Sequence, residues 1–277
     1  MEKEDLPQAA EALMSQAKTL RLKDKTEEAI AAYLAAEELW AQLSDERGRS
    51  RCWTAVGKAY FKGQDQLKAV EAFQRSAEYA AAAEWPDKEI EARYNKGLIL
   101  ERIGTKSANL SQVNGAIQAF QQALAVARSI NDTGSVGVLL LSLGFNCAWA
   151  KRDAEAIKYL IEAVPFALNG VDFDTAFSAL SSLGVLLSNQ GRGNEAIPYY
   201  ERALELAKSQ QGDIVAVADT YANLGIAYEK AGRLDEAIEA IDTYREILHT
   251  VGDVKAGNAQ AMLKQLRDKK RVQQTKV

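Results

Sequence analysis

The residue types that most often carry out catalysis are scarce in this chain of 277 residues, which has one histidine and two cysteines. A cysteine nucleophile needs a base within hydrogen-bond reach, and a zinc site needs several histidines or cysteines at short spacing. His249, Cys52 and Cys147 stand far apart along the chain, and no glycine-rich phosphate-binding motif is present. We therefore expect no catalytic residues, no metal and no cofactor, so the sequence does not predict an enzyme.

The composition points to a folded protein without an affinity for polyanions. Hydrophobic residues make up 47% of the chain and charged residues 26%, and the formal net charge is −4. A negative net charge gives no general attraction to nucleic acid, and no apolar run is long enough to predict a membrane span or a signal peptide. Two cysteines that are distant in sequence are typical of a reducing compartment. We expect a cytoplasmic protein that does not bind nucleic acid.

The strongest pattern is a repeated spacing of small and large residues. A first small residue recurs at steps of 40, 40, 47, 40 and 41 residues: Ala17, Gly57, Gly97, Gly144, Gly184 and Gly225. A second small residue follows each of them: Ala29, Ala69, Ala116, Ala156, Ala196 and Ala237. A large residue stands four positions later: Tyr33, Phe73, Phe120, Leu160, Tyr200 and Ile241. A small residue lets two helices approach closely, and a large side chain fills the gap. The spacing predicts six helix pairs joined by this contact.

The most regular copy shows which family the pattern resembles. Tyr221, Leu224, Gly225 and Tyr228 share one face of a helix, and a second helix follows a turn at 230–233. This pattern resembles tetratricopeptide repeats of about 40 residues, as in Pins-type adaptors, kinesin light chains and Rap-type bacterial regulators. The resemblance implies an all-α fold, a right-handed α-solenoid of six helix pairs with a capping helix at its C-terminal end.

On this interpretation residues 1–277 form a single domain. We expect the repeats at about 8–44, 45–86, 87–131, 132–171, 172–212 and 213–252, with the capping helix and a basic tail at 253–277. An acidic residue precedes the first helix of most pairs, and the capping helix, at a similar distance from the small residue. We predict that it begins the helix, because aspartate accepts hydrogen bonds from the free backbone N–H groups there. These residues are Asp45, Asp87, Asp132, Asp172, Asp213 and Asp253.

Two segments depart from the regular pattern. The turn of the third repeat is seven residues longer than the others, and the polar residues 105–115 predict that it forms an exposed loop. The insertion arose by neutral drift, or alternatively it serves as a recognition loop. Ala259, Met262, Leu263 and Leu266 predict the apolar face of the capping helix, and the basic segment after Leu266 predicts a solvated tail. The cap favours a monomer.

The resemblance implies that the first helices line a concave groove that holds the ligand. Counting from each small residue places a basic group at the start of this groove: Lys18, Arg21, Arg51, Lys58 and Lys62. An apolar and aromatic group follows: Tyr94, Leu98, Leu141, Phe145 and Trp149. Such a strip suits a protein or peptide with acidic and apolar segments. The alternative is that Phe145 and Trp149 pack against neighbouring helices, while the lysines are ordinary solvent-exposed charges.

The sequence therefore favours a non-catalytic scaffold or adaptor that binds a partner polypeptide in its groove. The alternative function is a peptide-sensing regulatory receptor of the Rap-like type, whose groove changes shape when a short peptide binds.

Overall fold

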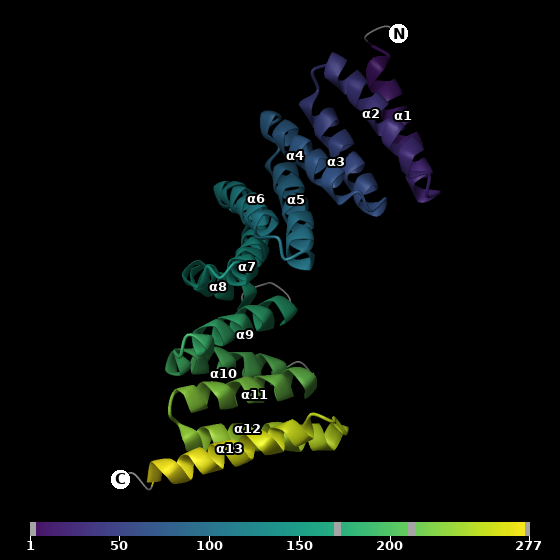
Figure 1. The fold of residues 1–277 in the computed structure, drawn as a ribbon. Helices are drawn as coiled ribbons and strands as arrows, with labels where there is room; N and C mark the ends of the chain where they lie inside the picture. The colour runs from purple at the N-terminus through teal and green to yellow at the C-terminus, as the bar shows by residue number, and fades with distance from the viewer. Residues whose placement is uncertain (1–3, 169–172, 210–213, 275–277) are drawn as a thin grey trace. The chain divides into compact units, whose positions relative to one another are not determined.

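The computed structural model describes residues 4–168, 173–209 and 214–274, and all regular secondary structure within these ranges is helical. The all-α prediction is confirmed. The described helices are α1 Leu6–Leu22, α2 Thr26–Gln42, α3 Glu46–Lys62, α4 Gln66–Ala82, α5 Pro86–Lys106, α6 Leu110–Ser129, α7 Thr133–Trp149, α8 Asp153–Leu168, α9 Phe173–Asn189, α10 Gly193–Ser209, α11 Ile214–Lys230, α12 Leu234–Val251 and α13 Ala256–Gln274 (Figure 1).

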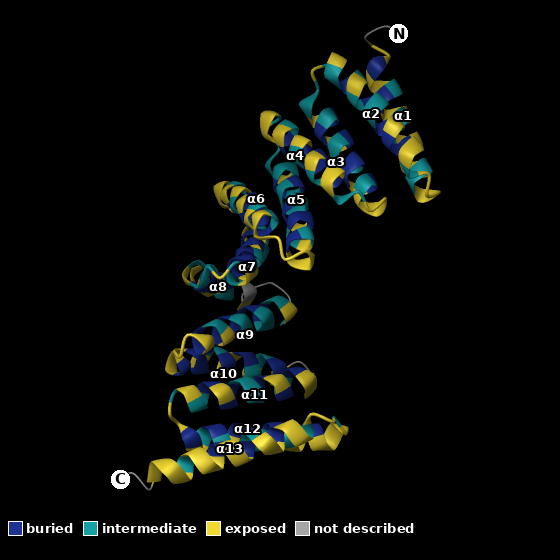
Figure 2. Ribbon diagram, viewed as in Figure 1, coloured by how far each residue is buried: buried dark blue, intermediate teal, exposed yellow. Residues whose placement is uncertain are grey.

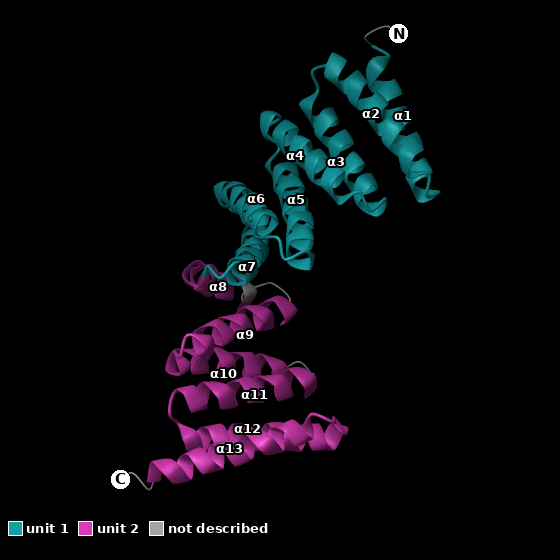
Figure 3. Cartoon of the chain, in the orientation of Figure 1, with its two compact units in different colours: residues 1–152 teal, residues 153–277 magenta. Residues whose placement is uncertain are grey.

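The helices form two compact units, Met1–Arg152 with α1 to α7 and Asp153–Val277 with α8 to α13 (Figure 3). Within each unit every helix packs against the next one in the chain, as in a solenoid of helix pairs. The buried faces lie between neighbouring helices, whereas exposed residues follow their outer faces (Figure 2). A single domain over residues 1–277 stays a prediction.

The predicted contact between small and large residues is confirmed at four of the six helix pairs. A Cβ atom added to Gly97 would lie 2.5 Å from the ring of Phe120, and one added to Gly184 would lie 2.6 Å from Tyr200. Gly57 faces Phe73 and Gly225 faces Ile241 in the same way. Phe120 is fully buried. Because the glycine leaves room for the ring, the two helices of a pair approach closely along this line.

Short turns reverse the chain between helices, and several predicted aspartates begin the next helix. Asn131 has a φ of 57°, and the N–H of Asp132 donates to the Ala127 carbonyl at 2.9 Å, closing α6 with a left-handed residue. The Asp132 carboxylate then accepts from the Ser135 N–H at 3.1 Å, and hydrogen bonds from Ser135 lower the pKa of Asp132. Asp45 caps α3 through the Gly48 N–H at 2.9 Å. The two predictions are confirmed.

The other predicted caps have different outcomes. Asp253 accepts from the Lys255 N–H at 2.8 Å just before α13, which supports the predicted helix start. The prediction for Asp87 is wrong, because α5 already begins at Pro86 and Asp87 lies within its first turn. Proline favours this first position, since its fixed φ suits a helix and its missing N–H costs no hydrogen bond there. Asp172 and Asp213 lie outside the described residues.

The long third turn is not the exposed loop that the sequence predicts. Helix α5 has 21 residues and α6 has 20, against 17 in α3 and α4, so the seven additional residues extend the two helices by about one turn each. Adding a whole turn keeps the apolar face in phase. Val113 is therefore buried, and an added Cβ at Gly104 would overlap its side chain at 2.6 Å. Residues 105–111 are exposed as expected, although only 107–109 lie between the helices.

The capping helix is confirmed, and the segment after Leu266 is largely exposed as predicted, but it is helical as far as Gln274, where α13 ends. Leu263 and Leu266 are buried in a cluster with residues of α12. Lys269 forms an ion pair with Glu229 of α11 at 2.9 Å, and Lys270 forms one with Asp235 of α12. Ion pairs from these two basic residues therefore connect the end of α13 to α11 and α12.

The outer face of α13 is polar at the positions that form the packing contact in a regular repeat. Lys264, Gln265 and Asp268 stand 40 residues after Leu224, Gly225 and Tyr228, whose positions in a regular repeat face the second helix of the pair. All three are exposed in α13. These polar residues replace the packing contact of a regular repeat, as expected of a capping helix.

The first prediction concerns the contact between Gly97 and Phe120. Phe120→Ala removes a fully buried ring and should lower the free energy of unfolding by about 3–5 kcal/mol, as measured by urea denaturation. Leu67→Ala, at a side chain that is 65% exposed, should change it by less than about 0.5 kcal/mol. Equal effects would show that the contact does not hold the pair together.

The second prediction concerns Lys96, which occupies the position before the small residue where Leu224 stands in the last repeat. Burial lowers the pKa of Lys96, and its Nζ donates to Gln74 Oε1 at 2.6 Å. Lys96→Leu removes a partly buried charge and should raise the free energy of unfolding by about 0.5–2 kcal/mol. Lys106→Leu, at an exposed position of the same helix, serves as the control.

Candidate functional site

The first helices of the pairs in the first unit contact one another through polar side chains. Arg51 of α3 forms a two-pronged ion pair with Glu11 of α1, with nitrogen–oxygen distances of 2.5 and 3.0 Å. The Lys58 ammonium of α3 lies 2.8 Å from a carboxylate oxygen of Glu91 in α5. The Asn146 amide of α7 donates to Glu101 of α5 at 2.9 Å. The surface that α1, α3, α5 and α7 share is called the inner face below.

Three of the five predicted basic residues are already paired with carboxylates. Arg51 pairs with Glu11, Lys58 with Glu91, and Lys62 with Asp24. Lys62 also donates to the Arg21 carbonyl at 3.3 Å. These pairs link neighbouring repeats, so the inner face carries less uncompensated positive charge than the sequence predicts.

The remaining two predicted basic residues keep their charge available. Lys18 is exposed on α1, and Arg21 is partly buried near the end of the same helix. Neither side chain has an ion-pair partner in the part of the chain that the structure describes.

Glu91 is the centre of the ionic contacts on the inner face. It accepts hydrogen bonds from Lys58 and Lys88 at 2.8 and 2.7 Å. Burial alone would raise the pKa of Glu91, but the hydrogen bonds and charges of the two lysines outweigh it and lower the pKa. The carboxylate is therefore ionised at neutral pH and its charge is compensated.

The predicted apolar residues divide into an open and a packed group. Leu98, Phe145 and Trp149 are 38%, 38% and 37% exposed. Tyr94 and Leu141 are partly buried, and the Tyr94 ring lies against Phe120 with centroids 5.7 Å apart. Packing therefore accounts for much of the Tyr94 surface, whereas the first three residues leave apolar surface open to solvent.

An apolar cavity of about 340 Å³ lies among α3, α4 and α5. Its lining residues are Phe61, Phe73, Leu98 and Ile99, with Lys58, Asn95 and Arg102 among them as the polar members. The Arg102 guanidinium lies 5.7 Å from the centroid of the Phe61 ring. Neither Phe61 nor Arg102 belongs to the set predicted above. The spacing does assign both to groove positions, since they follow Gly57 and Gly97 by four and five residues, as Arg21 and Trp149 follow Ala17 and Gly144, but they were left out of the basic and apolar groups.

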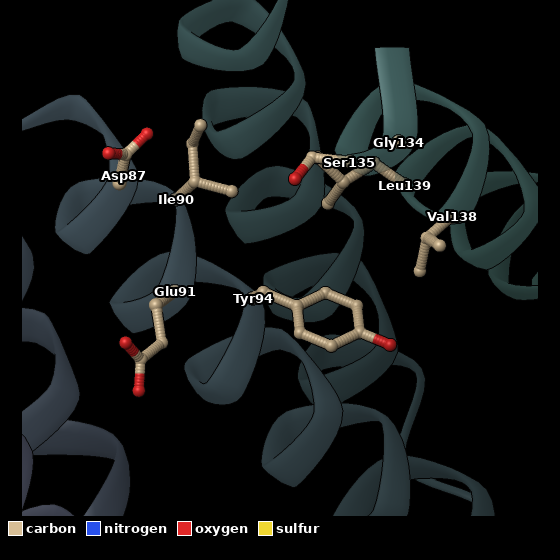
Figure 4. Close-up of a pocket in the computed structure, with 8 residues that line it drawn as sticks. All are labelled: Asp87, Ile90, Glu91, Tyr94, Gly134, Ser135, Val138 and Leu139. Carbon is tan, nitrogen blue, oxygen red and sulfur yellow. The ribbon is translucent and has the colours of Figure 1, made fainter. Parts of the chain in front are cut away.

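A second cavity, of about 280 Å³, lies between α5 and α7. Figure 4 shows Asp87, Ile90, Glu91 and Tyr94 on the α5 side, with the Tyr94 ring extending towards Val138 of α7. Gly134, Ser135 and Leu139 complete the α7 side. A third cavity of about 210 Å³ lies beside the first two, and Lys58 and Glu91 contribute to it. The inner face thus carries a series of small cavities suited to single side chains.

The candidate catalytic groups do not come together. Cys52 is buried, and desolvation raises the pKa of its thiol to about 12, so the reactive thiolate is not formed at neutral pH. Cys147, which stands three residues after Gly144 as Tyr228 does after Gly225, is buried too. The described residues contain no cluster of three or more histidine, cysteine or acidic side chains able to hold a metal ion. Among them, no helix combines the length and apolar character that crossing a membrane requires.

The third prediction follows from the lowered pKa of Glu91. A lowered carboxyl pKa stabilises the folded state above the unfolded value of about 4.5, and this contribution is lost as the pH falls through the folded value. Glu91→Gln should therefore lower the free energy of unfolding by about 1 kcal/mol or less at pH 7, because the pairs are partly exposed. Urea denaturation across pH 3–7 should show the two proteins converging in acid. A constant difference across this range would contradict the ionic account, and Glu205→Gln, at an exposed pair with Arg202, is the control.

Comparison with known proteins places this geometry in a family. Residues 175–248 match the model of the tetratricopeptide repeat family, and they span α9 to α12 almost completely. No curated protein matches the chain in sequence.

Solved structures match nearly the whole chain in fold. BtubC (BKLC) from P. vanneervenii has a TM-score of 0.60 at 17% identity, covering 91% of this chain and 93% of its own. A kinesin light chain-like protein of Podosopora anserina with nearly identical repeats has a TM-score of 0.57 at 16% identity, covering 73% and 96%. The apo form of RapI has a TM-score of 0.58 at 14% identity, covering 95% and 98%. At these identities the likeness concerns the fold alone.

The spacing that marks α9 to α12 continues through the helix pairs of the first unit, and the similar structures extend over both units. Domains of this repeat are typically non-catalytic and generally bind proteins or peptides. The chain contains tetratricopeptide repeats at residues 175–248 and is similar in fold to kinesin light chain-like and Rap repeat proteins.

Proposed function

We propose that this protein is a non-catalytic scaffold or adaptor that binds a partner polypeptide on the inner face of its first unit. The observation that carries the proposal is the apolar cavity of about 340 Å³ among α3, α4 and α5. Leu98 and Phe61 expose 38% and 41% of their surface there. A cavity of this size and lining accepts one large apolar side chain, the usual anchor of a peptide ligand.

The rest of the inner face supports an extended ligand. Phe145 and Trp149 of α7 add exposed aromatic surface, and the cavity between α5 and α7 adds a second place for a side chain. Lys18 and Arg21 on α1 and Arg102 on α5 offer cations without carboxylate partners among the described residues. The partner we propose therefore contains apolar anchors next to acidic residues, and it needs neither nucleic acid nor a cofactor.

The largely polar outer face of α13 supports a monomeric scaffold, because its exposed apolar side chains, Ala261 and Val272, offer little surface for end-to-end stacking. The two unbridged cysteines are consistent with the proposed cytoplasmic location.

A peptide-sensing receptor of the Rap-like type would use the same face and differ in its response. A receptor changes conformation when the peptide binds, whereas a scaffold keeps its shape. Small-angle scattering with and without the bound partner distinguishes them: an unchanged radius of gyration supports the scaffold, and a change at saturation supports the receptor.

The fourth prediction tests the cavity directly. Reversing the charge of Arg51 and Lys58 would also break their pairs with Glu11 and Glu91, so an apolar position gives a cleaner variant. Leu98→Asp places a charge in the apolar cavity and should weaken partner binding by at least about tenfold. The measurement is affinity capture from native extract with quantitative mass spectrometry, followed by titration of the captured partner.

Leu67→Asp is the matched control, since Leu67 is an exposed leucine on α4 that does not line the cavity. A partner retained by Leu67→Asp and lost by Leu98→Asp supports the proposal. Equal capture by both variants, each folded by circular dichroism, would remove the cavity from the binding site.

A further inference from the structure

Helix α5 carries two charged side chains beside the cavities of the inner face that have no ion-pair partner among the described residues. Asp87 lies in the first turn of α5 and lines the cavity between α5 and α7 (Figure 4). Arg102 lies near the other end of the helix and lines the apolar cavity among α3, α4 and α5. Arg102 contacts the ring of Phe61, which leaves its nitrogen atoms available to an acceptor.

The charges between these two positions cancel. Glu91 holds both Lys58 and Lys88 at 2.8 and 2.7 Å. Glu101, which accepts a hydrogen bond from the neutral Asn146 amide, adds a second negative charge, so the charges of these two acids and two lysines sum to zero. Asn95, Tyr94 and Leu98 are uncharged. The electrostatic pattern along this part of the inner face is therefore negative at the start of α5, compensated in the middle, and positive near its end.

The separation sets a length for a ligand that reaches both charges. Asp87 and Arg102 are 15 residues apart on one helix, which is about 22 Å along its axis. An extended peptide covers about 3.3 Å per residue, so the same distance corresponds to about seven residues.

We propose that the ligand runs along α5 with a fixed order of charges: an acidic residue beside its apolar anchor at Arg102, and a lysine or arginine about seven residues away at Asp87. The inference rests on the proposed function, because it assigns the chemistry of the same inner face. A guanidinium suits a carboxylate, since it donates two parallel hydrogen bonds. At the other cavity, Ile90, Val138 and Leu139 offer an apolar wall for the stem of a basic side chain, and Asp87 and the Ser135 hydroxyl lie near its end.

The test uses two fluorescent peptide libraries of equal composition and varied apolar anchor. The matched library has aspartate beside the anchor and lysine after a neutral spacer of about six residues, and the swapped library exchanges the two charges. Both are made in both chain directions, and binding is measured by fluorescence anisotropy at low and high salt. The protein should bind the best matched peptide about four- to twenty-fold more tightly than its swapped partner, from two partly exposed ion pairs. The preference should weaken in high salt.

Variants locate the preference in named residues. Arg102→Gln should remove the discrimination between aspartate and asparagine beside the anchor, and Asp87→Asn should remove that between lysine and glutamine. Lys106→Gln, an exposed cation in the last turn of α5 that lines neither cavity, should leave both unchanged. Thermal unfolding confirms that each variant is folded.

The outcomes separate the two proposals. Equal binding of matched and swapped peptides, abolished by Leu98→Asp, would overturn the charge order and leave the binding face intact. A preference that survives both Arg102→Gln and Asp87→Asn would also overturn the charge order. No binding of any peptide to the folded protein would count against the proposed function together with this inference.

Discussion

The structure depends on one repeated contact, a glycine or alanine on the first helix of a pair against a large side chain on the second. At Gly97 the Phe120 ring occupies the space where a Cβ atom would stand, and Gly184 and Tyr200 repeat the arrangement in the second unit. This contact fixes how closely two helices approach. It also fixes which side of each first helix is buried, and hence which side remains for a partner. Helix α13 keeps the register but has exposed polar residues at the contact positions.

Many charged side chains of the inner face form ion pairs with one another. Glu11, Arg51 and Glu91 occupy the same register position in three successive repeats, so an acid and a base meet when the repeats stack. Exposed pairs of this kind contribute little to stability. The pairs matter more for ligand recognition, because a lysine that already pairs with a carboxylate attracts an acidic ligand less strongly than an unpaired lysine does. On the proposed function, the apolar cavities and the charges without an ion-pair partner among the described residues carry the specificity.

Much of the fold could be predicted from the sequence alone, because the packing contact requires small and large residues at a regular spacing. The helix pairs, the aspartate caps of α3 and α7, and the cap formed by Leu263 and Leu266 follow from local spacing. The segment 105–115 was misjudged because polarity suggested a loop, whereas its length, close to two helical turns, favours helices that stay in phase. The basic residues of α13 were misjudged because their partners, Glu229 and Asp235, lie in other helices.

The candidate site was less predictable for a related reason. The spacing identified the inward positions, but it did not show which charges would be compensated. Opposite charges one period apart, such as Glu11 and Arg51, were the available signal. Arg102 and Asp87 are distinguished only by the absence of such a partner among the described residues, which becomes visible when the neighbouring helices are in place.

The central claim is that a partner polypeptide binds on the inner face formed by α1, α3, α5 and α7. Hydrogen–deuterium exchange of the protein alone and saturated with its captured partner tests this claim most directly, because it reports the contacted helices without any substitution. The account predicts that slowed exchange is concentrated in α3, α5 and α7. Protection confined to the second helices α2, α4 and α6, or to the second unit, would contradict it.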